Sequence, residues 1–188
     1  MNHHAQLGLA PRNQHDSDPR IADMLSKAKA SLGMVPNMYA TMANAPALLE
    51  TYMSGYASFR AESDFNATEQ ELVFLVISEQ NGCDYCIAAH SVVADMSKVP
   101  TAVTDAIRNG GSLEDLRLSA LATFTRVMFE TRGRPAQSDL DAFISAGYTE
   151  QHVLYLVLAM ALKTISNYSN HLFNTPLDRA FQSREWRR

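Results

Sequence analysis

The sequence predicts an all-α fold. No segment alternates apolar and polar residues between turn pairs, as strands at a protein surface do, so no strand is required anywhere. Apolar residues instead recur every three or four positions behind helix-start signals, which is the periodicity of helices that pack on a core. The chain has 188 residues, of which 46% are hydrophobic and 19% charged, an ordinary composition for one globular domain.

The chain begins with a polar stretch and then turns helical. Residues 1–17 predict a flexible N-terminal arm, and residues 18–188 predict a single all-helical domain. Asp18 precedes Pro19, which is an N-cap followed by proline at the first helical position. This first helix is expected to end at Gly33, because glycine accepts the left-handed backbone of a helix end.

The clearest helix start in the chain is "NATEQELVFLVIS" (66–78). Thr68 as N-cap and Glu71 three residues later form a capping box ahead of an apolar run. The dipeptide Asn81-Gly82 interrupts this run, so a second helix is expected from about Cys83 to Met96.

Turn residues and caps divide the rest of the chain. The further helices are predicted over residues 46–60, 100–109, 113–131, 138–146 and 150–173, with a final turn after Pro176. The apolar run "VLYLVLAMAL" (153–162) predicts a buried core helix. Residues 71–90 and 152–171 can be aligned without gaps and both end on histidine, a pattern that an ancient internal duplication would leave.

Charge and hydropathy exclude several classes of function. The formal net charge is −4 and the sequence pI is about 5.8, with no basic stripe of the kind that binds nucleic acid. The first residues lack the apolar stretch of a secretory signal, and the longest apolar run is half of the roughly 20 residues that span a bilayer. We therefore expect a cytoplasmic protein that binds neither nucleic acid nor a membrane.

Both cysteines of the chain stand in "SEQNGCDYCIAAH" (78–90). On a helix Cys83, Cys86 and His90 would form one column, because residues three and four apart share a face. A C-x-x-C pair in a reducing compartment is more often redox-active or metal-bound than a structural disulfide.

The three side chains are suited to thiol chemistry. A cysteine at a helix start has its thiolate stabilised by the unpaired N–H groups, which favours Cys83 as the reactive residue. His90 can accept a proton from Cys86, and Glu71 on the preceding helix can orient that histidine. We favour Cys86 as the cysteine that attacks the O–O bond of a hydroperoxide, after which its sulfenic acid condenses with Cys83.

The spacing E-x11-C-x-x-C-x3-H resembles the signature of the alkylhydroperoxidase D (AhpD)-like branch of the carboxymuconolactone decarboxylase family. The segment "GMVPNMYATMANAPALLETY" is similar to the lead-in of the peroxidase-related members, so the resemblance covers roughly residues 20–175. It implies an AhpD-like helical fold, homo-oligomers (dimers, trimers or hexamers), and reduction of organic hydroperoxides and hydrogen peroxide with a thiol or dithiol reductant and no cofactor. The matching residues, Glu71, Cys83, Cys86 and His90, form the catalytic relay of that family.

The sequence departs from the best-studied form of this motif at one position. That form has a second histidine just before the second cysteine, and this chain has Tyr85 there. A tyrosine hydroxyl donates a hydrogen bond but is a weak base near neutral pH, since its ordinary pKa is about 10. Tyr85 is therefore an auxiliary candidate, together with Glu79, which lies four residues before Cys83. Proton transfer is expected to be slower than in the prototype of the family.

Several alternatives remain open from the residues alone. The cysteines can be inert, or they can bind zinc with His90 and either Glu71 or Glu79. Glu71 can serve only as a capping residue. At the level of the protein, a redox sensor that changes its oligomeric state without turnover is one alternative. A carboxymuconolactone decarboxylase-type enzyme, which needs no cysteine pair, is another.

The polar end of the last long helix, "SNYSNHL" (166–172), also has two interpretations. Its polar side chains can be hydrogen-bonded in the core or exposed where the helix frays. Alternatively, this end of the helix lines the same pocket as the cysteines or a contact between subunits.

Overall fold

The computed structural model describes residues 5–187, which contain helices and no strand, so the all-α prediction is confirmed. The longest of these helices, Glu150–Phe173, has the bounds predicted for it, and Thr149 caps it. The elements are α1 (Pro19–Leu32), α2 (Asn37–Met42), α3 (Pro46–Glu62), α4 (Ala67–Asn81), α5 (Asp84–Met96), α6 (Thr101–Arg108), α7 (Leu116–Glu130), α8 (Gln137–Ser145), α9 (Glu150–Phe173) and the 3-10 helix η1 (Arg179–Arg184).

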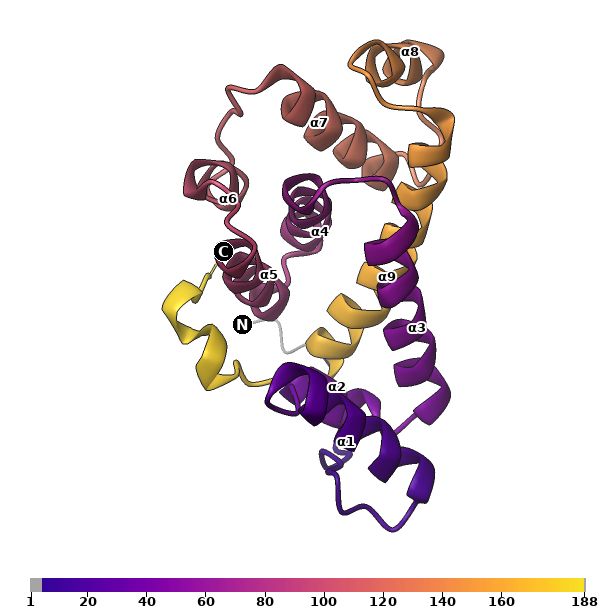
Figure 1. Ribbon diagram of the computed structural model, residues 1–188, viewed down its shortest axis with the longest axis vertical. Helices are drawn as coiled ribbons and strands as arrows, with labels where there is room; N and C mark the ends of the chain where they lie inside the picture. The colour runs from indigo at the N-terminus through magenta and orange to yellow at the C-terminus, as the bar shows by residue number, and fades with distance from the viewer. Residues whose placement is uncertain (1–4, 188) are drawn as a thin grey trace.

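Helix α4 is the centre of the fold. Every residue from Glu69 to Ser78 is buried, including a run of six apolar residues that covers all sides of the helix. A helix that is apolar all round must be enclosed by others, and α4 contacts α5, α6, α7 and α9, which surround it in Figure 1. Any polar side chain on α4 is therefore held inside the protein.

The turn at Gly82 lays α5 against α4. Gly82 has the left-handed backbone (φ 64°) that glycine adopts at least cost, and its N–H bonds back to the end of α4. The chain then reverses through Cys83, whose N–H donates to the Ser78 carbonyl at 2.9 Å, and α5 begins at Asp84. The predicted break between the two helices is confirmed, and it brings the cysteine segment beside Glu71.

The cap of α4 differs from the prediction. Asn66, not Thr68, is the N-cap residue, and its side chain accepts from the Glu69 N–H at 3.1 Å while Glu69 returns a hydrogen bond to the Asn66 N–H at 2.9 Å. The sequence holds two overlapping box patterns two residues apart, and the helix starts at the earlier one. Glu71 is thus not a capping residue, and its carboxylate is free to serve elsewhere.

The start of α7 also lies later than predicted, at Leu116 instead of Leu113. The Asp115 carboxylate accepts from two N–H groups of the first turn, those of Arg117 at 2.8 Å and Leu118 at 3.0 Å. Aspartate satisfies these orphan donors strongly, which fixes the first turn here.

Helix α9 is not fully buried, so the prediction of a core helix from its apolar run was wrong. Leu156, Ala159 and Leu162 pack inward, but Leu154 and Val157 are 70% and 51% exposed. The apolar run is continuous in sequence, yet only one face of α9 packs on α3 and α4. The expected homo-oligomer and the internal duplication remain predictions. No helix in the described part of the chain is long and apolar enough to cross a membrane.

The two ends of the chain lie against the helices. Residues 5–17 have no helix and are held by backbone hydrogen bonds from Leu7 to Leu172 and from Arg12 to Ala40, both 2.8 Å; residues 1–4 of the predicted arm are outside the described residues. The flexibility of this arm stays a prediction. The predicted final turn is the 3-10 helix η1, which packs on α5 at the left of Figure 1.

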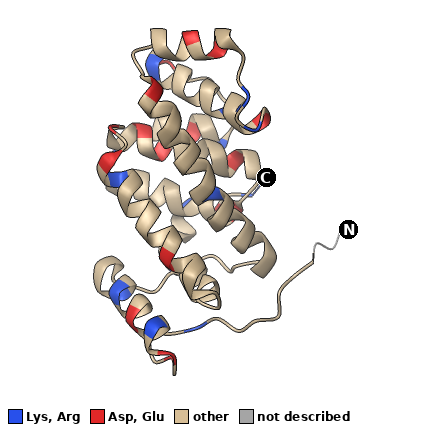
Figure 2. Ribbon diagram, turned by 90° about the vertical axis from the view of Figure 1, so that its right-hand side faces the viewer, with Lys and Arg blue, Asp and Glu red and all other residues tan. Residues whose placement is uncertain are grey.

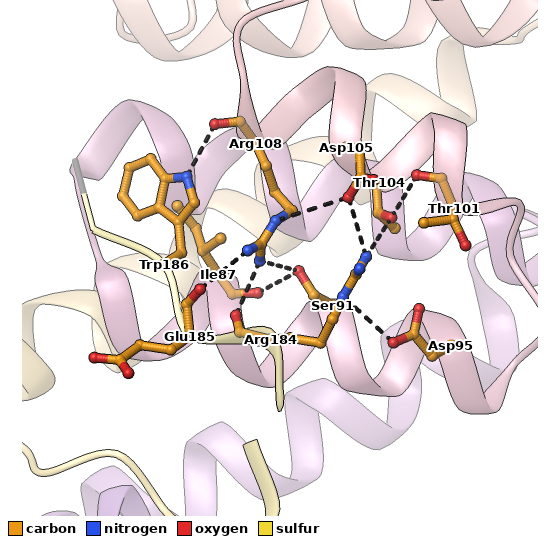
Figure 3. A network of polar contacts seen from close by, with 10 residues as sticks. All are labelled: Ile87, Ser91, Asp95, Thr101, Thr104, Asp105, Arg108, Arg184, Glu185 and Trp186. Carbon is orange, nitrogen blue, oxygen red and sulfur yellow. Dashed lines mark hydrogen bonds and ion pairs between the residues drawn. The ribbon is translucent and has the colours of Figure 1, made fainter. Parts of the chain in front are cut away.

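A polar network ties the C-terminal segment to α5 and α6 (Figure 3). The Arg184 guanidinium lies 3.3 Å from both Asp95 and Asp105, and Arg108 donates to the Arg184 carbonyl at 3.1 Å. The Trp186 indole N–H donates to the Arg108 carbonyl at 2.9 Å. In the ribbon of Figure 2, the Lys and Arg positions are spread over several helices and are interspersed with Asp and Glu positions.

We expect Asn66→Ala to lower the free energy of unfolding by about 1 kcal/mol, because it removes the N-cap acceptor of the central helix. Thr68→Ala is the matched control and should change the free energy by less than about 0.5 kcal/mol. Urea unfolding measures both. An equal loss in the two variants would contradict the cap assignment.

Candidate active site

Glu71 and His90 meet between α4 and α5. The Glu71 carboxylate is completely buried, and its Oε2 lies 2.9 Å from His90 Nδ1. Its Oε1 accepts a hydrogen bond from the Arg60 guanidinium of α3, which also donates to the Tyr56 hydroxyl. Phe74 stacks on the imidazole with ring centroids 4.8 Å apart. The ring of His90 is thus fixed on its edge and on its face.

The environment sets the protonation of this pair. Burial alone would raise the pKa of Glu71, but the hydrogen bond and charge of His90 and the charge of Arg60 lower it below its ordinary value. Burial and the charge of Lys163 lower the pKa of His90, against the raising effect of Glu71. His90 is therefore neutral near pH 7, with its Nδ1–H donated to the carboxylate. Its Nε2 is left with a free lone pair.

The two cysteines are reduced and buried. Cys83 is the N-cap residue of α5 and Cys86 lies in its first turn. The Asn170 amide of α9 donates to Cys86 Sγ at 3.2 Å and lies 3.9 Å from Cys83 Sγ. Asn167 and Asn170 at the polar end of α9 are thus buried and hydrogen-bonded, as the first interpretation of its sequence proposed, and Asn170 also contacts the cysteine pair.

The pKa values of the two thiols shift in opposite directions. The pKa of Cys83 is raised, because its S–H is held by Cys86 and because burial disfavours its charged form. Burial would also raise the pKa of Cys86, but the Cys83 hydrogen bond, the charge of Lys163 and the Asn170 amide bring it well below its ordinary value. The directions of the two shifts favour Cys86 over Cys83 as the thiolate. Cys83 stands at the N-cap position, as the helix-start argument expects, but its side chain makes no capping hydrogen bond to the first turn of α5.

Lys163 is a site residue that the sequence interpretation missed. It projects from α9 with 1% of its surface exposed, and its Nζ has no hydrogen-bond partner among the described residues. The ammonium lies 5.6 Å from the centroid of the Phe74 ring. It acts electrostatically on both cysteines and on His90.

Tyr85 is turned away from proton transfer. Its hydroxyl donates to Asp178 at 2.5 Å in the segment before η1, and Asp178 also accepts from the Asn37 N–H at 3.1 Å. Burial and the Asp178 carboxylate raise the pKa of Tyr85, so it stays neutral. Glu79, the other auxiliary candidate, lies in the last turn of α4 and accepts from the Gln80 amide at 2.7 Å.

A cavity of about 420 Å³ reaches the reactive sulfur. Cys86 and His90 line it, whereas Cys83 does not. Its walls are mainly apolar and aromatic and come from both ends of the chain, among them Leu32, Met38, Tyr39, Tyr52, Tyr56, Tyr85 and Phe181. Such a cavity fits an organic molecule with an apolar body.

Metal binding has no support in the arrangement of these side chains. Among residues 5–187 no group of three or more His, Cys, Asp or Glu side chains is placed to hold a metal ion. Of the three residues considered as zinc ligands beside the cysteines, Glu71 and His90 are hydrogen-bonded to each other, and Glu79 accepts from the Gln80 amide.

The comparisons with known proteins agree with the motif. Residues 46–102 match the model of the carboxymuconolactone decarboxylase family, which confirms the predicted resemblance over the part of the chain that holds Glu71, both cysteines and His90. A search of curated proteins found no match.

Solved structures extend the likeness to nearly the whole chain. An alkylhydroperoxidase AhpD core, an uncharacterized peroxidase-related protein from Ralstonia eutropha JMP134, has a TM-score of 0.76 at 17% identity and covers 92% of this chain and 96% of its own. The fold is AhpD-like. A peroxidase-related protein from Silicibacter sp. TM1040 has a TM-score of 0.78 at 18% identity, with 96% and 95% covered. This level of identity establishes the fold, so the activity must be argued from the site.

The same fold also occurs in an enzyme of different description. The debrominase Bmp8 has a TM-score of 0.75 at 16% identity, with 94% of this chain and 96% of that one covered. A cysteine-to-alanine variant of Bmp8 in complex with 2,3,4-tribromopyrrole has a TM-score of 0.76 at 15% identity, with 96% and 97% covered.

We expect iodoacetamide to label Cys86 before Cys83 at pH 6. The pKa of Cys86 is lowered and Cys86 lines the cavity, whereas the pKa of Cys83 is raised and Cys83 does not line the cavity. Peptide mapping of the reduced protein after partial alkylation measures the order. Preferential labelling of Cys83 would overturn the assignment.

We expect Glu71→Gln to lower the free energy of unfolding by roughly 3 kcal/mol at pH 7, because Arg60 loses its buried anion. The folded pKa of Glu71 is below its ordinary 4.5, so its contribution is present above that pH and is lost as pH falls further. The wild type and the variant should therefore converge in acid. Glu62→Gln, at an exposed position, is the control, and a constant gap between pH 7 and pH 3 contradicts the assignment.

Proposed function

We propose that the protein is a thiol-dependent peroxidase that reduces organic hydroperoxides or hydrogen peroxide through Cys83 and Cys86. The observation that carries the proposal is the position of the Cys86 sulfur, which lines an apolar cavity beside the unprotonated Nε2 of His90. The family match and the peroxidase-related neighbours support the same reaction type.

The first step oxidises Cys86. Its thiolate attacks the terminal oxygen of the hydroperoxide, the O–O bond breaks, and Cys86 becomes a sulfenic acid. The alkoxide that leaves takes a proton, which His90 Nε2 collects from solvent and passes on while Glu71 holds Nδ1. Because the pKa of His90 is lowered, its imidazolium form is a strong donor and does not persist.

The second step forms the disulfide. Cys83 keeps its thiol proton, and its sulfur attacks the sulfenic acid of Cys86. The thiol proton and the hydroxyl group leave together as water. An external thiol or dithiol then reduces the disulfide by exchange and is itself oxidised, which returns the pair to its starting state.

The cavity favours organic hydroperoxides over hydrogen peroxide. Its apolar and aromatic walls gain from covering an alkyl or aryl group, and hydrogen peroxide offers no such group. Tyr85 contributes its ring to this wall, since its hydroxyl is engaged by Asp178.

Reductive debromination of an aromatic ring is a second candidate, favoured by the likeness to Bmp8 and by the aromatic lining of the cavity. Its balance is one aryl bromide and two thiols giving the arene, a disulfide and hydrogen bromide. Incubation of the reduced protein with 2,3,4-tribromopyrrole and measurement of released bromide separates this activity from peroxide reduction.

We expect the wild type to consume cumene hydroperoxide with dithiothreitol and to pass through an intramolecular disulfide seen by mass spectrometry. Cys83→Ser, Cys86→Ser and His90→Asn should each lose at least ~100-fold in turnover, because each removes a group used in the cycle. His171→Asn, at the exposed end of α9, is the matched control and should keep its rate.

The same experiment addresses the rival functions. Unchanged turnover in either serine variant would contradict the peroxidase mechanism. A disulfide that changes the oligomer size on a sizing column, without peroxide consumption, would favour the redox sensor. Activity on a lactone acid that survives loss of both cysteines would favour the decarboxylase-type enzyme.

A further inference from the structure

The ammonium of Lys163 lies in the core without a visible partner. Its side chain is 1% exposed and its Nζ makes no hydrogen bond among the described residues. The Phe74 ring, 5.6 Å from Nζ, offers a weak cation–π contact and cannot replace an anion. A charge this deeply buried is stable only when an opposite charge lies close to it.

Lys163 faces the cysteine pair from α9. Lys163, Asn167 and Asn170 stand at positions i, i+4 and i+7 and so share one face of that helix. The Asn170 amide of this face touches the Cys86 sulfur at 3.2 Å. At the other end, the Phe74 ring beneath Lys163 also stacks on His90. The ammonium therefore belongs to the same enclosed space as Cys86.

Among the negatively charged groups around Lys163, one candidate remains as its ion-pair partner. Both oxygens of Glu71 are engaged, one by Arg60 and one by His90. Cys83 holds its proton, which it donates to Cys86. We propose that Lys163 is the counter-ion that keeps the Cys86 sulfur charged, and that it acts as a positioning residue for the reactive thiolate.

This ion pair links the charge on the Cys86 sulfur to the oxidation state of the cysteine pair. When Cys86 forms a bond to Cys83, the negative charge on its sulfur disappears and the ammonium loses its partner. The disulfide is then the less favourable state, so its reduction by an external thiol is promoted. The role of this ion pair in turnover rests on the proposed function. The ion pair itself does not require a peroxide.

The other titratable groups of the space do not supply this charge. They are Cys83 and His90 on α5, Glu71 on α4, Arg60, Tyr52 and Tyr56 on α3, Tyr39 on α2, and the Tyr85–Asp178 pair between α5 and the segment before η1. The tyrosines and the Cys83 thiol are neutral, and the carboxylates are engaged by hydrogen bonds.

The pH profile of Cys86 alkylation tests the pair directly. Lys163→Met should move the midpoint of the iodoacetamide profile upward by about one pH unit, which is a roughly tenfold loss of rate at any pH below both midpoints. Lys163→Arg keeps the charge and should restore most of the wild-type profile. Lys29→Met, on the surface of α1, is the control. A wild-type profile in Lys163→Met overturns the proposal.

A stability measurement covers the case in which Lys163→Met does not fold. At pH 8 Cys86→Ser leaves the ammonium without an anion, whereas Cys83→Ser does not, so Cys86→Ser should unfold at a clearly lower urea concentration. Equal midpoints for the two serine variants overturn the proposal. Neither measurement uses a peroxide. If the wild type reduces no peroxide, the proposed function is wrong, and the alkylation and unfolding results still decide whether Lys163 pairs with Cys86.

Discussion

The structure depends on charge compensation inside a core that excludes water. Glu71 sits on the one helix that other helices enclose on every side, and its carboxylate is tolerated because Arg60 and His90 each engage one oxygen. That requirement fixes α3, α4 and α5 relative to one another. It also fixes the imidazole ring that lines the cavity, so the packing of the core and the orientation of His90 depend on the same contacts.

Sequence patterns predicted the helices well where one signal dominated and less well where two competed. Gly82 ends α4 and Thr149 caps α9 as expected, because no neighbouring residue offers an alternative. The start of α4 was misassigned because Asn66 with Glu69 and Thr68 with Glu71 are equally good boxes by spacing. The burial of α9 was overestimated because an apolar run does not reveal which of its faces the remaining helices cover.

The motif predicted Glu71, Cys83, Cys86 and His90, which lie on α4 and α5 or at the turn between them. The structure adds residues that only tertiary packing brings to this site. Arg60 lies on the helix before Glu71, 11 residues earlier, and Asp178 follows Tyr85 by 93 residues, so no motif spacing connects them. Lys163 did carry a signal, since a lysine inside a strongly apolar helix requires a buried anion nearby. The sequence did not say which anion, because α5 and α9 are far apart along the chain.

The cavity beside Cys86 has walls from α1, α2, α3, α5 and the segment around η1. Ala180 and Phe181, which complete this enclosure, follow the cysteine motif by roughly half of the chain. Substitutions in this distant segment can therefore reshape the wall of the cavity while Cys86, His90 and their hydrogen-bond partners stay unchanged.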